Sequence, residues 1–143
     1  MIAAKELSRT LKRALLDDIQ NIFLFNDEGS IIAAANSAVD KQADSVVAAV
    51  LASIFGEYRA AEQCVTDDPN EPNLLNHVIM DCDQARVAVT VFLRGDDSVM
   101  FLCAVGSTKV PHGLLLKRLE LVRDNISCLK AVLLAAMEPP DQR

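Results

Sequence analysis

One stretch of the sequence, residues 99–105, is apolar at every position. A strand of this composition has no polar face to turn toward water, so both of its faces must be buried. A sheet that is covered by helices on both sides provides such a site. A chain of 143 residues is long enough for one ordinary domain with one substantial core. This strand therefore predicts a sheet that lies between two layers of helices.

Four further apolar runs predict the remaining strands. Residues 21–25 and 31–35 flank a polar turn that contains Gly29, and glycine can supply the positive φ angle that a short hairpin loop needs. Residues 77–82 and 86–93 precede the apolar run with short polar breaks between them, as in a meander. Strands joined by turns this short pair antiparallel, so we expect a five-stranded antiparallel sheet.

Three segments place their apolar residues at helical spacing. They are residues 3–16, a segment from Asp40 or Ala43 to about residue 62, and a final helix that begins near Pro111. The final helix carries one apolar stripe of residues that alternate in steps of four and three: Leu115, Leu119, Val122, Ile126, Leu129, Leu133 and Ala136. We therefore expect an α+β fold, a three-layer α/β/α sandwich with the order α-β-β-α-β-β-β-α. It forms a single domain over residues 1–143, with its core at about 5–134 and a short polar tail at 138–143.

The charge balance excludes two classes of partner. Fourteen Lys and Arg against twenty Asp and Glu give a net charge of -6, and no basic cluster is longer than two residues. We therefore expect no nucleic-acid binding and no polybasic membrane attachment. The apolar runs are shorter than the ~20 residues of a membrane helix, and charged residues interrupt the amino-terminal segment where a signal peptide would be apolar. These features predict a cytoplasmic protein without direct membrane insertion that reaches membranes only through partners.

The sequence offers no group of residues typical of a catalytic centre. His77 and His112 belong to no zinc-binding pattern, and no glycine-rich phosphate loop is present. The acidic pairs at residues 67–68 and 96–97 lie in turn-rich segments, where solvated carboxylates are common. The four cysteines are far apart and form no C-x-x-C pair, so we interpret them as buried, reduced thiols: Cys64, Cys82, Cys103 and Cys128. We expect no enzyme activity, no metal and no cofactor.

The second predicted helix has no charged face. One stripe carries large apolar residues: Val46, Val47, Val50, Leu51, Ile54, Phe55 and Tyr58. The other side carries small residues: Ser45, Ala48, Ala49, Ala52, Ser53 and Gly56. We expect the large stripe to pack on the sheet and the small side to take a partner, because small side chains allow close helix approach. The alternative is that alanines serve as helix formers on a solvated face.

A free sheet edge offers a second point of contact with a partner. An antiparallel sheet has two edges, and an unprotected edge can pair with a strand of another subunit. Residues 76–82 are our candidate, and Asn76, His77, Val78, Ile79 and Met80 complete the predicted dimer interface with the small side of the helix. The alternative is an ordinary edge that His77 and Asp81 protect. Replacing Ala49 or Ala52 by a bulky charged residue is expected to abolish pairing at modest cost to the fold.

At several places the sequence resembles the roadblock, or dynein light chain, domain family. The similarity covers about residues 5–134 and is carried by residues 25–31 and Ala33 of the hairpin, residues 48–54 and Tyr58 of the second helix, and the I-M-D-C run at 79–82 followed by R-V-A-V-T at 86–90. Within that family the chain resembles the roadblock subunit of the Ragulator, which pairs with the MAP-kinase scaffold subunit. In the family, the second helix and the third strand form the dimer interface.

The resemblance implies a scaffold with no catalytic role. With a second roadblock-domain subunit, expected to be a different chain, the protein would form a platform that a lipidated anchor subunit wraps. Rag-type GTPases would dock there for mTOR signalling at the cytosolic face of late endosomes and lysosomes. The alternatives are a roadblock homodimer that regulates a small GTPase, as in bacterial polarity, and a dynein light chain-type cargo adaptor. A ligand-sensing domain ranks last, because the strands offer few polar groups to a ligand.

Overall fold

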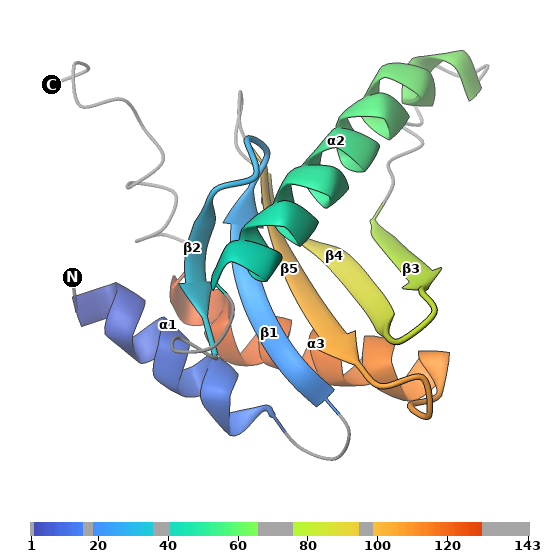
Figure 1. Cartoon of the computed structure of the whole chain (residues 1–143). Helices are drawn as coiled ribbons and strands as arrows, with labels where there is room; N and C mark the ends of the chain where they lie inside the picture. The colour runs from blue at the N-terminus through green and yellow to red at the C-terminus, as the bar shows by residue number, and fades with distance from the viewer. Residues whose placement is uncertain (1, 16–18, 36–40, 66–75, 95–98, 130–143) are drawn as a thin grey trace, which may run out of the picture.

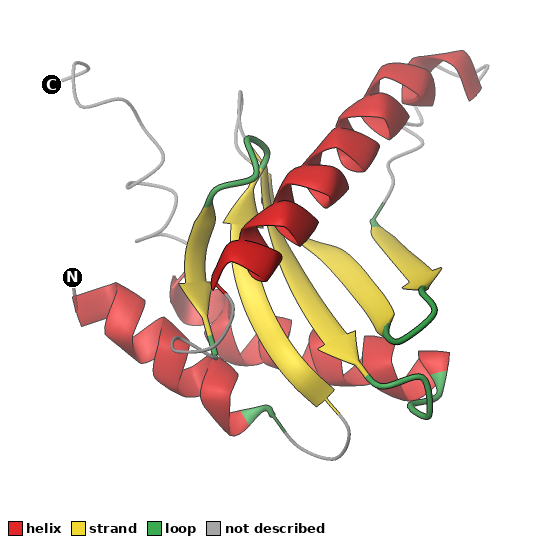
Figure 2. Cartoon of the chain, viewed as in Figure 1, coloured by secondary structure: helices red, strands yellow, loops and turns green. Residues whose placement is uncertain are grey.

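The chain folds into a sheet with helices on both faces (Figures 1 and 2). The computed structural model describes residues 2–15, 19–35, 41–65, 76–94 and 99–129. The elements are α1 (Ile2–Arg13), β1 (Ile19–Asn26), β2 (Ile31–Ala34), α2 (Lys41–Val65), β3 (His77–Asp81), β4 (Arg86–Arg94), β5 (Val99–Gly106), α3 (His112–Ile126) and the short 3-10 helix η1 (Ser127–Leu129). This order confirms the one that the sequence predicts.

Strand β5 lies at the centre of the sheet. The five strands run in the order β2-β1-β5-β4-β3, and all neighbours pair antiparallel. Every residue from Val99 to Ala104 is buried, which confirms that this part of the apolar run has both faces covered, whereas Val105 is half-buried. Its neighbour β1 is buried in the same way from Asn21 to Phe25.

Two separate apolar cores lie on the two faces of the sheet. On one face, α1 contributes Leu7 and Leu11, and α3 contributes a buried stripe: Leu115, Leu119, Val122 and Ile126. On the other face, α2 places Phe55 against Phe101 of β5, with 4.5 Å between ring centroids. Phe101 in turn stacks on Phe25 of β1 at 5.1 Å. The molecule is therefore a three-layer sandwich, as predicted.

The hairpin between β1 and β2 depends on two residues. The Asn26 side-chain oxygen accepts hydrogen bonds from the backbone N–H groups of Glu28 (3.0 Å) and Ser30 (2.9 Å). Gly29 has a φ angle of 85°, which confirms the predicted positive φ. A Cβ atom at this position would lie 2.9 Å from the Cα atom of Ala49, so the turn touches the backbone of α2. Gly29 thus allows both the backbone conformation of the turn and the close packing of α2 against it.

Some sequence predictions lie outside the described residues or need correction. The structure does not describe several residues for which the sequence made a prediction: the acidic pairs at 67–68 and 96–97, Leu133, Ala136, the tail at 138–143, and the side chains of Cys64 and Leu129. Cys103 is buried, but the prediction of burial is wrong for Cys82 and Cys128, which are exposed. Cys82 directly follows the edge strand β3, and Cys128 lies in η1 at the end of α3, so neither has a layer above it.

Gly29→Ala is expected to destabilise the fold by about 1–3 kcal/mol, because it combines an unfavourable positive φ with a clash against α2. Gly113→Ala is the matched control, since a Cβ atom there meets nothing within 4 Å. Urea unfolding of both variants measures the difference. Equal stability of the two variants would contradict the proposed contact between turn and helix.

Candidate interaction surface

Helix α2 packs on the sheet through a different side from the one that the sequence predicts. The side chains that face the sheet are Ala48, Leu51, Ala52 and Phe55. In contrast, Val46, Val50 and Tyr58 are 59%, 51% and 53% exposed. The expectation that these three pack on the sheet is therefore wrong, as is the expectation that Ala48 and Ala52 face outward.

The reason lies in the volume of the sheet residues. Phe23, Phe25 and Phe101 all point toward α2 and occupy much of the space below it. Small residues at positions 48 and 52 then let the helix approach, while Leu51 and Phe55 fill the remaining space. Because Ala52 is only 8% exposed, a bulky charged residue there would disrupt this core rather than only the pairing.

The outward side of α2 is consequently more apolar than predicted. Of the predicted interface residues, Ala49, Ser53 and Gly56 are exposed on the helix, and the side chain of Ser45 is outside the described residues. The sequence interpretation missed Val46, Val50 and Tyr58 as candidates. The signal that could have identified them is the set of phenylalanines at alternating strand positions, which predicts one crowded sheet face and hence a small-residue helix side against it.

Strand β3 is an edge of the sheet, as predicted. It pairs with β4 alone among the described strands. The Val91 N–H donates to the Asn76 carbonyl at 2.9 Å, and the Cys82 N–H donates to the Ala85 carbonyl at 2.8 Å. In an antiparallel ladder these bonds alternate along the strand, so the backbone groups of His77, Ile79 and Asp81 point away from the sheet. Among the described residues, no strand pairs with these outward groups.

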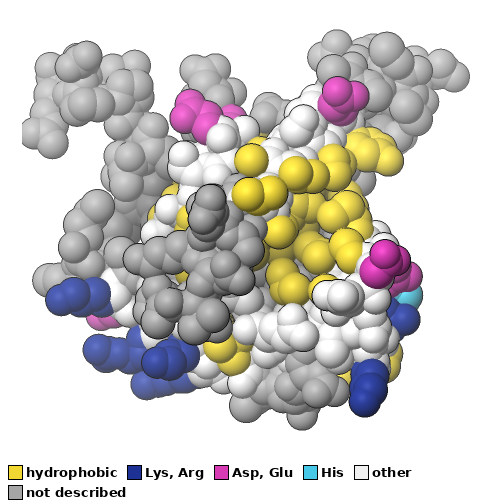
Figure 3. Space-filling view, viewed as in Figure 1, with side chains coloured by type: hydrophobic (Ala, Val, Ile, Leu, Met, Phe, Trp, Pro, Cys, Tyr) yellow, Lys and Arg dark blue, Asp and Glu magenta, His cyan; other side chains and the backbone are white. Residues whose placement is uncertain are grey.

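The sheet face beside β3 is apolar and only partly covered. Val78 and Met80 stand opposite Val89 and Val87 of β4, on the same face as α2. Val78, Met80, Val91 and Val105 are half-buried. Figure 3 shows hydrophobic side chains gathered over α2 and over the neighbouring sheet. We call this the α2–β3 surface: Val46, Ala49, Val50, Ser53, Gly56 and Tyr58 of α2, with Val78, Met80 and the outer backbone of β3.

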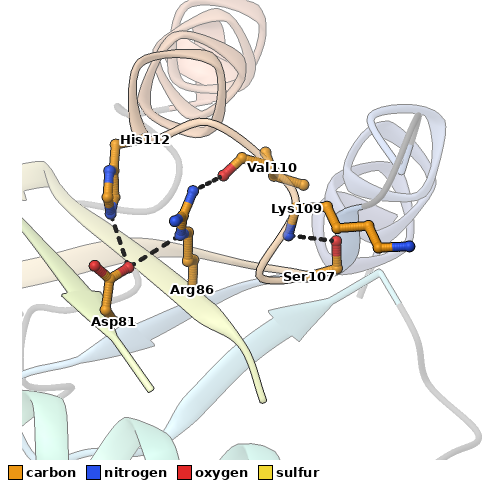
Figure 4. A network of polar contacts seen from close by, with 6 residues as sticks. All are labelled: Asp81, Arg86, Ser107, Lys109, Val110 and His112. Atoms are coloured by element: carbon orange, nitrogen blue, oxygen red, sulfur yellow. Dashed lines mark hydrogen bonds and ion pairs between the residues drawn. The ribbon is translucent and has the colours of Figure 1, made fainter. Parts of the chain in front are cut away.

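Polar contacts hold the edge strand from behind, on the α3 side. The Asp81 carboxylate lies 3.1 Å from Arg86 Nε and 2.7 Å from His112 Nε2 (Figure 4). Arg86 Nη1 also donates to the Val110 carbonyl at 2.5 Å, just before α3. The hydrogen bond with His112 lowers the pKa of Asp81 below its ordinary value of 3.8, and the charge of Arg86 acts in the same direction.

Two consecutive side-chain hydrogen bonds hold the other end of β3. Arg123 Nη1 of α3 donates to the Thr90 hydroxyl at 3.3 Å, and this hydroxyl donates to the Asn76 carbonyl at 3.2 Å. Both ends of the strand are thus fixed to α3 by side chains, and the outward backbone groups of β3 take no part. The described strand is therefore held in place with its pairing edge open.

The described residues offer little for chemistry. Within them, no three His, Cys, Asp or Glu side chains gather where a metal ion could be held. His77 and Asn76 are both exposed, and His112 contacts a single carboxylate. None of the described helices is long and apolar enough to cross a membrane.

Comparison with solved structures identifies the fold. An MglB "with tetrameric arrangement" has a TM-score of 0.74 at 11% identity, covering 92% of this chain and 93% of that chain. Myxococcus xanthus MglB has a TM-score of 0.69 at 14% identity, covering 96% and 94%. A Roadblock/LC7 domain from Streptomyces avermitilis has a TM-score of 0.63 at 12% identity, covering 87% and 92%. No family model matches the sequence. The chain has the roadblock fold, which confirms the predicted fold class.

Asp81→Asn is expected to lower stability at neutral pH, because it removes the ion pair that fixes the edge strand. Because the pKa of Asp81 is lower in the folded protein than in the unfolded chain, its ionised carboxylate stabilises the fold at pH values above the unfolded-state pKa. This stabilisation is lost as the pH falls through the folded-state pKa. The stability difference between the unmodified chain and Asp81→Asn should therefore be full above about pH 4 and shrink below it. Urea unfolding at several pH values measures it, with exposed Asp83→Asn as control. A difference that stays constant down to low pH would contradict this role.

Proposed function

We propose that this chain is a non-enzymatic scaffold subunit that pairs with a second roadblock domain through the α2–β3 surface, and that the pair serves a small GTPase. The observation that carries the proposal is the continuity of the exposed apolar side of α2 with an open sheet edge. Monomeric proteins rarely expose large contiguous apolar patches, and they usually protect their edge strands.

The edge of β3 suits antiparallel pairing with an equivalent strand. When two copies are joined about a two-fold axis through Ile79, the outward backbone groups of the two strands face one another. His77 then lies opposite Asp81 of the partner subunit, and Val78 lies opposite Met80 of the partner subunit. The first pair brings an imidazole to a carboxylate, and the second buries apolar surface below the helices.

The outward side of α2 would complete the contact. Val46, Val50 and Tyr58 are each more than half exposed, and burying them against the partner's helix contributes about 1–2 kcal/mol per residue. Exposed Ala49, Ser53 and Gly56 between them permit a close approach of the two helices. Helix and strand together therefore form one interface.

For the second domain we propose a different roadblock chain, in an assembly of the Ragulator type. The support is the resemblance carried by residues 79–82 and 86–90, the β3–β4 hairpin that borders the proposed interface. In such an assembly a lipidated anchor subunit would bring the pair to late endosomes or lysosomes, where Rag-type GTPases dock. The second candidate is a homodimer that regulates a small GTPase, and it is favoured by the fold shared with MglB and by the self-complementary β3 register.

Val50→Glu is expected to convert the paired form to a monomer, because it places a charge in the centre of the apolar contact at a position that is 51% exposed in the single chain. Leu114→Glu is the control, since Leu114 is also exposed but lies on α3, on the opposite layer. Sedimentation equilibrium gives the mass of each variant. A Val50→Glu chain that pairs as well as the Leu114→Glu chain would show that α2 is not the interface.

The choice between the two candidates depends on the solution mass of the chain, purified alone and after co-expression with a second roadblock protein of the same organism. We expect a defined one-to-one complex with that protein. We also expect that this complex does not accelerate GTP hydrolysis by the small GTPase that it binds. A stable homodimer that ignores the second roadblock protein would instead establish the homodimeric regulator. A chain that is monomeric under both conditions would contradict pairing altogether.

A further inference from the structure

Both ends of β3 carry a polar side chain on the same face of the sheet. Asp81 contacts His112 of α3, and Ile79 packs against the core that α1 and α3 form. Because side chains alternate between the two faces along a strand, His77 lies on this face as well. His77 and Asp81 therefore flank Ile79 symmetrically, two residues to either side.

Each of the two side chains has hydrogen-bonding capacity that the described part of the chain does not use. His77 is exposed, and within the described residues its imidazole has no hydrogen bond. Arg86 and His112 both contact the same oxygen of Asp81, Oδ1. Figure 4 shows the second carboxylate oxygen directed away from these two contacts, and the Asp81 side chain is 58% exposed. The strand thus presents a donor at one end and an acceptor at the other.

The spacing of this donor and this acceptor matches an antiparallel copy of the same strand. In the two-fold arrangement about Ile79, His77 lies directly opposite Asp81 of the partner subunit, because the outward backbone groups of these residues face each other. The Cβ atoms of directly opposed residues lie about 4.5–5.5 Å apart, a gap that an imidazole N–H and a carboxylate oxygen can bridge. The two-fold axis repeats this contact, so it occurs twice in one pair.

The carboxylate is held in position before a partner arrives. Arg86 Nε lies 3.1 Å and His112 Nε2 lies 2.7 Å from Asp81 Oδ1, and Arg86 also donates to the Val110 carbonyl. A side chain that is already fixed loses less conformational entropy on binding than a free surface carboxylate. Asp81 is therefore suited to discriminate between partners, with Arg86 and His112 as positioning residues.

We infer that His77 and Asp81 select the strand that pairs with β3. They accept an antiparallel strand with a carboxylate facing His77 and a hydrogen-bond donor or a cation facing Asp81, and a second copy of this chain meets both conditions. A strand that places a carboxylate opposite Asp81 is rejected, because like charges directly opposite one another are destabilising. The selection rests on the pairing through β3 proposed above.

A disulfide tests whether two copies adopt this register. In the two-fold arrangement Asn76 lies opposite Cys82 of the partner subunit, in a pair whose Cα atoms are about 4.5 Å apart, within the range that a disulfide spans. Asn76→Cys is made in a chain in which the exposed Cys128 is replaced by serine, and it is expected to give a cross-linked dimer under mild oxidation. Adding Cys82→Ser is the control and should abolish the cross-link. Non-reducing gel electrophoresis measures both.

Charge-swapped variants test the selection itself. A fluorescein-labelled His77→Asp chain places a carboxylate opposite Asp81 of an unmodified copy, whereas an Asp81→Lys copy offers it an ammonium group instead. Asp83→Lys is the matched control, since it makes the same charge change in the exposed turn after β3. Fluorescence-detected sedimentation velocity measures each affinity, and urea unfolding confirms that every variant is folded.

We expect the labelled His77→Asp chain to bind Asp81→Lys about tenfold more tightly than Asp83→Lys, and the labelled unmodified chain to show the opposite order. Damage to the fold by Asp81→Lys cannot produce this reversal. Equal affinities in a chain that forms the cross-link would overturn the selection and leave the pairing intact. Without a Cys82-dependent cross-link the two side chains do not face each other, which also overturns the selection, while Val50→Glu judges the pairing through α2 separately.

Discussion

The burial of β5 from Val99 to Ala104 determines the arrangement of the other elements. A strand without a wet face must lie inside the sheet and needs a helical layer on each side, which α2 provides on one face and α1 with α3 on the other. Its neighbours β1 and β4 are then fixed by backbone pairing along its whole length. What remains at the margins, β2 and β3, is where the sheet can meet other molecules.

Much of this arrangement could be predicted from the sequence because its signals are local. The fully apolar β5 run, the turn at Gly29 and the stripe from Leu115 to Ile126 each indicate one element and its environment. These predictions needed no knowledge of which side chains meet across the layers.

The orientation of α2 could not be predicted in the same way. The helix is apolar or small on nearly all sides, so its own periodicity allows more than one packing side. The choice depends on the volume of Phe23, Phe25 and Phe101, which come from strands far apart in the sequence.

The packing of α2 through alanines, Leu51 and Phe55 has an evolutionary consequence. The residues that fix the helix to its own sheet are distinct from the residues on its outer side, of which Val46, Val50 and Tyr58 are the largest. Substitutions on the outer side therefore change what the helix recognises without changing how the chain folds. A duplicated copy of such a gene could acquire a new pairing preference through a few mutations, while its core stays under unchanged selection.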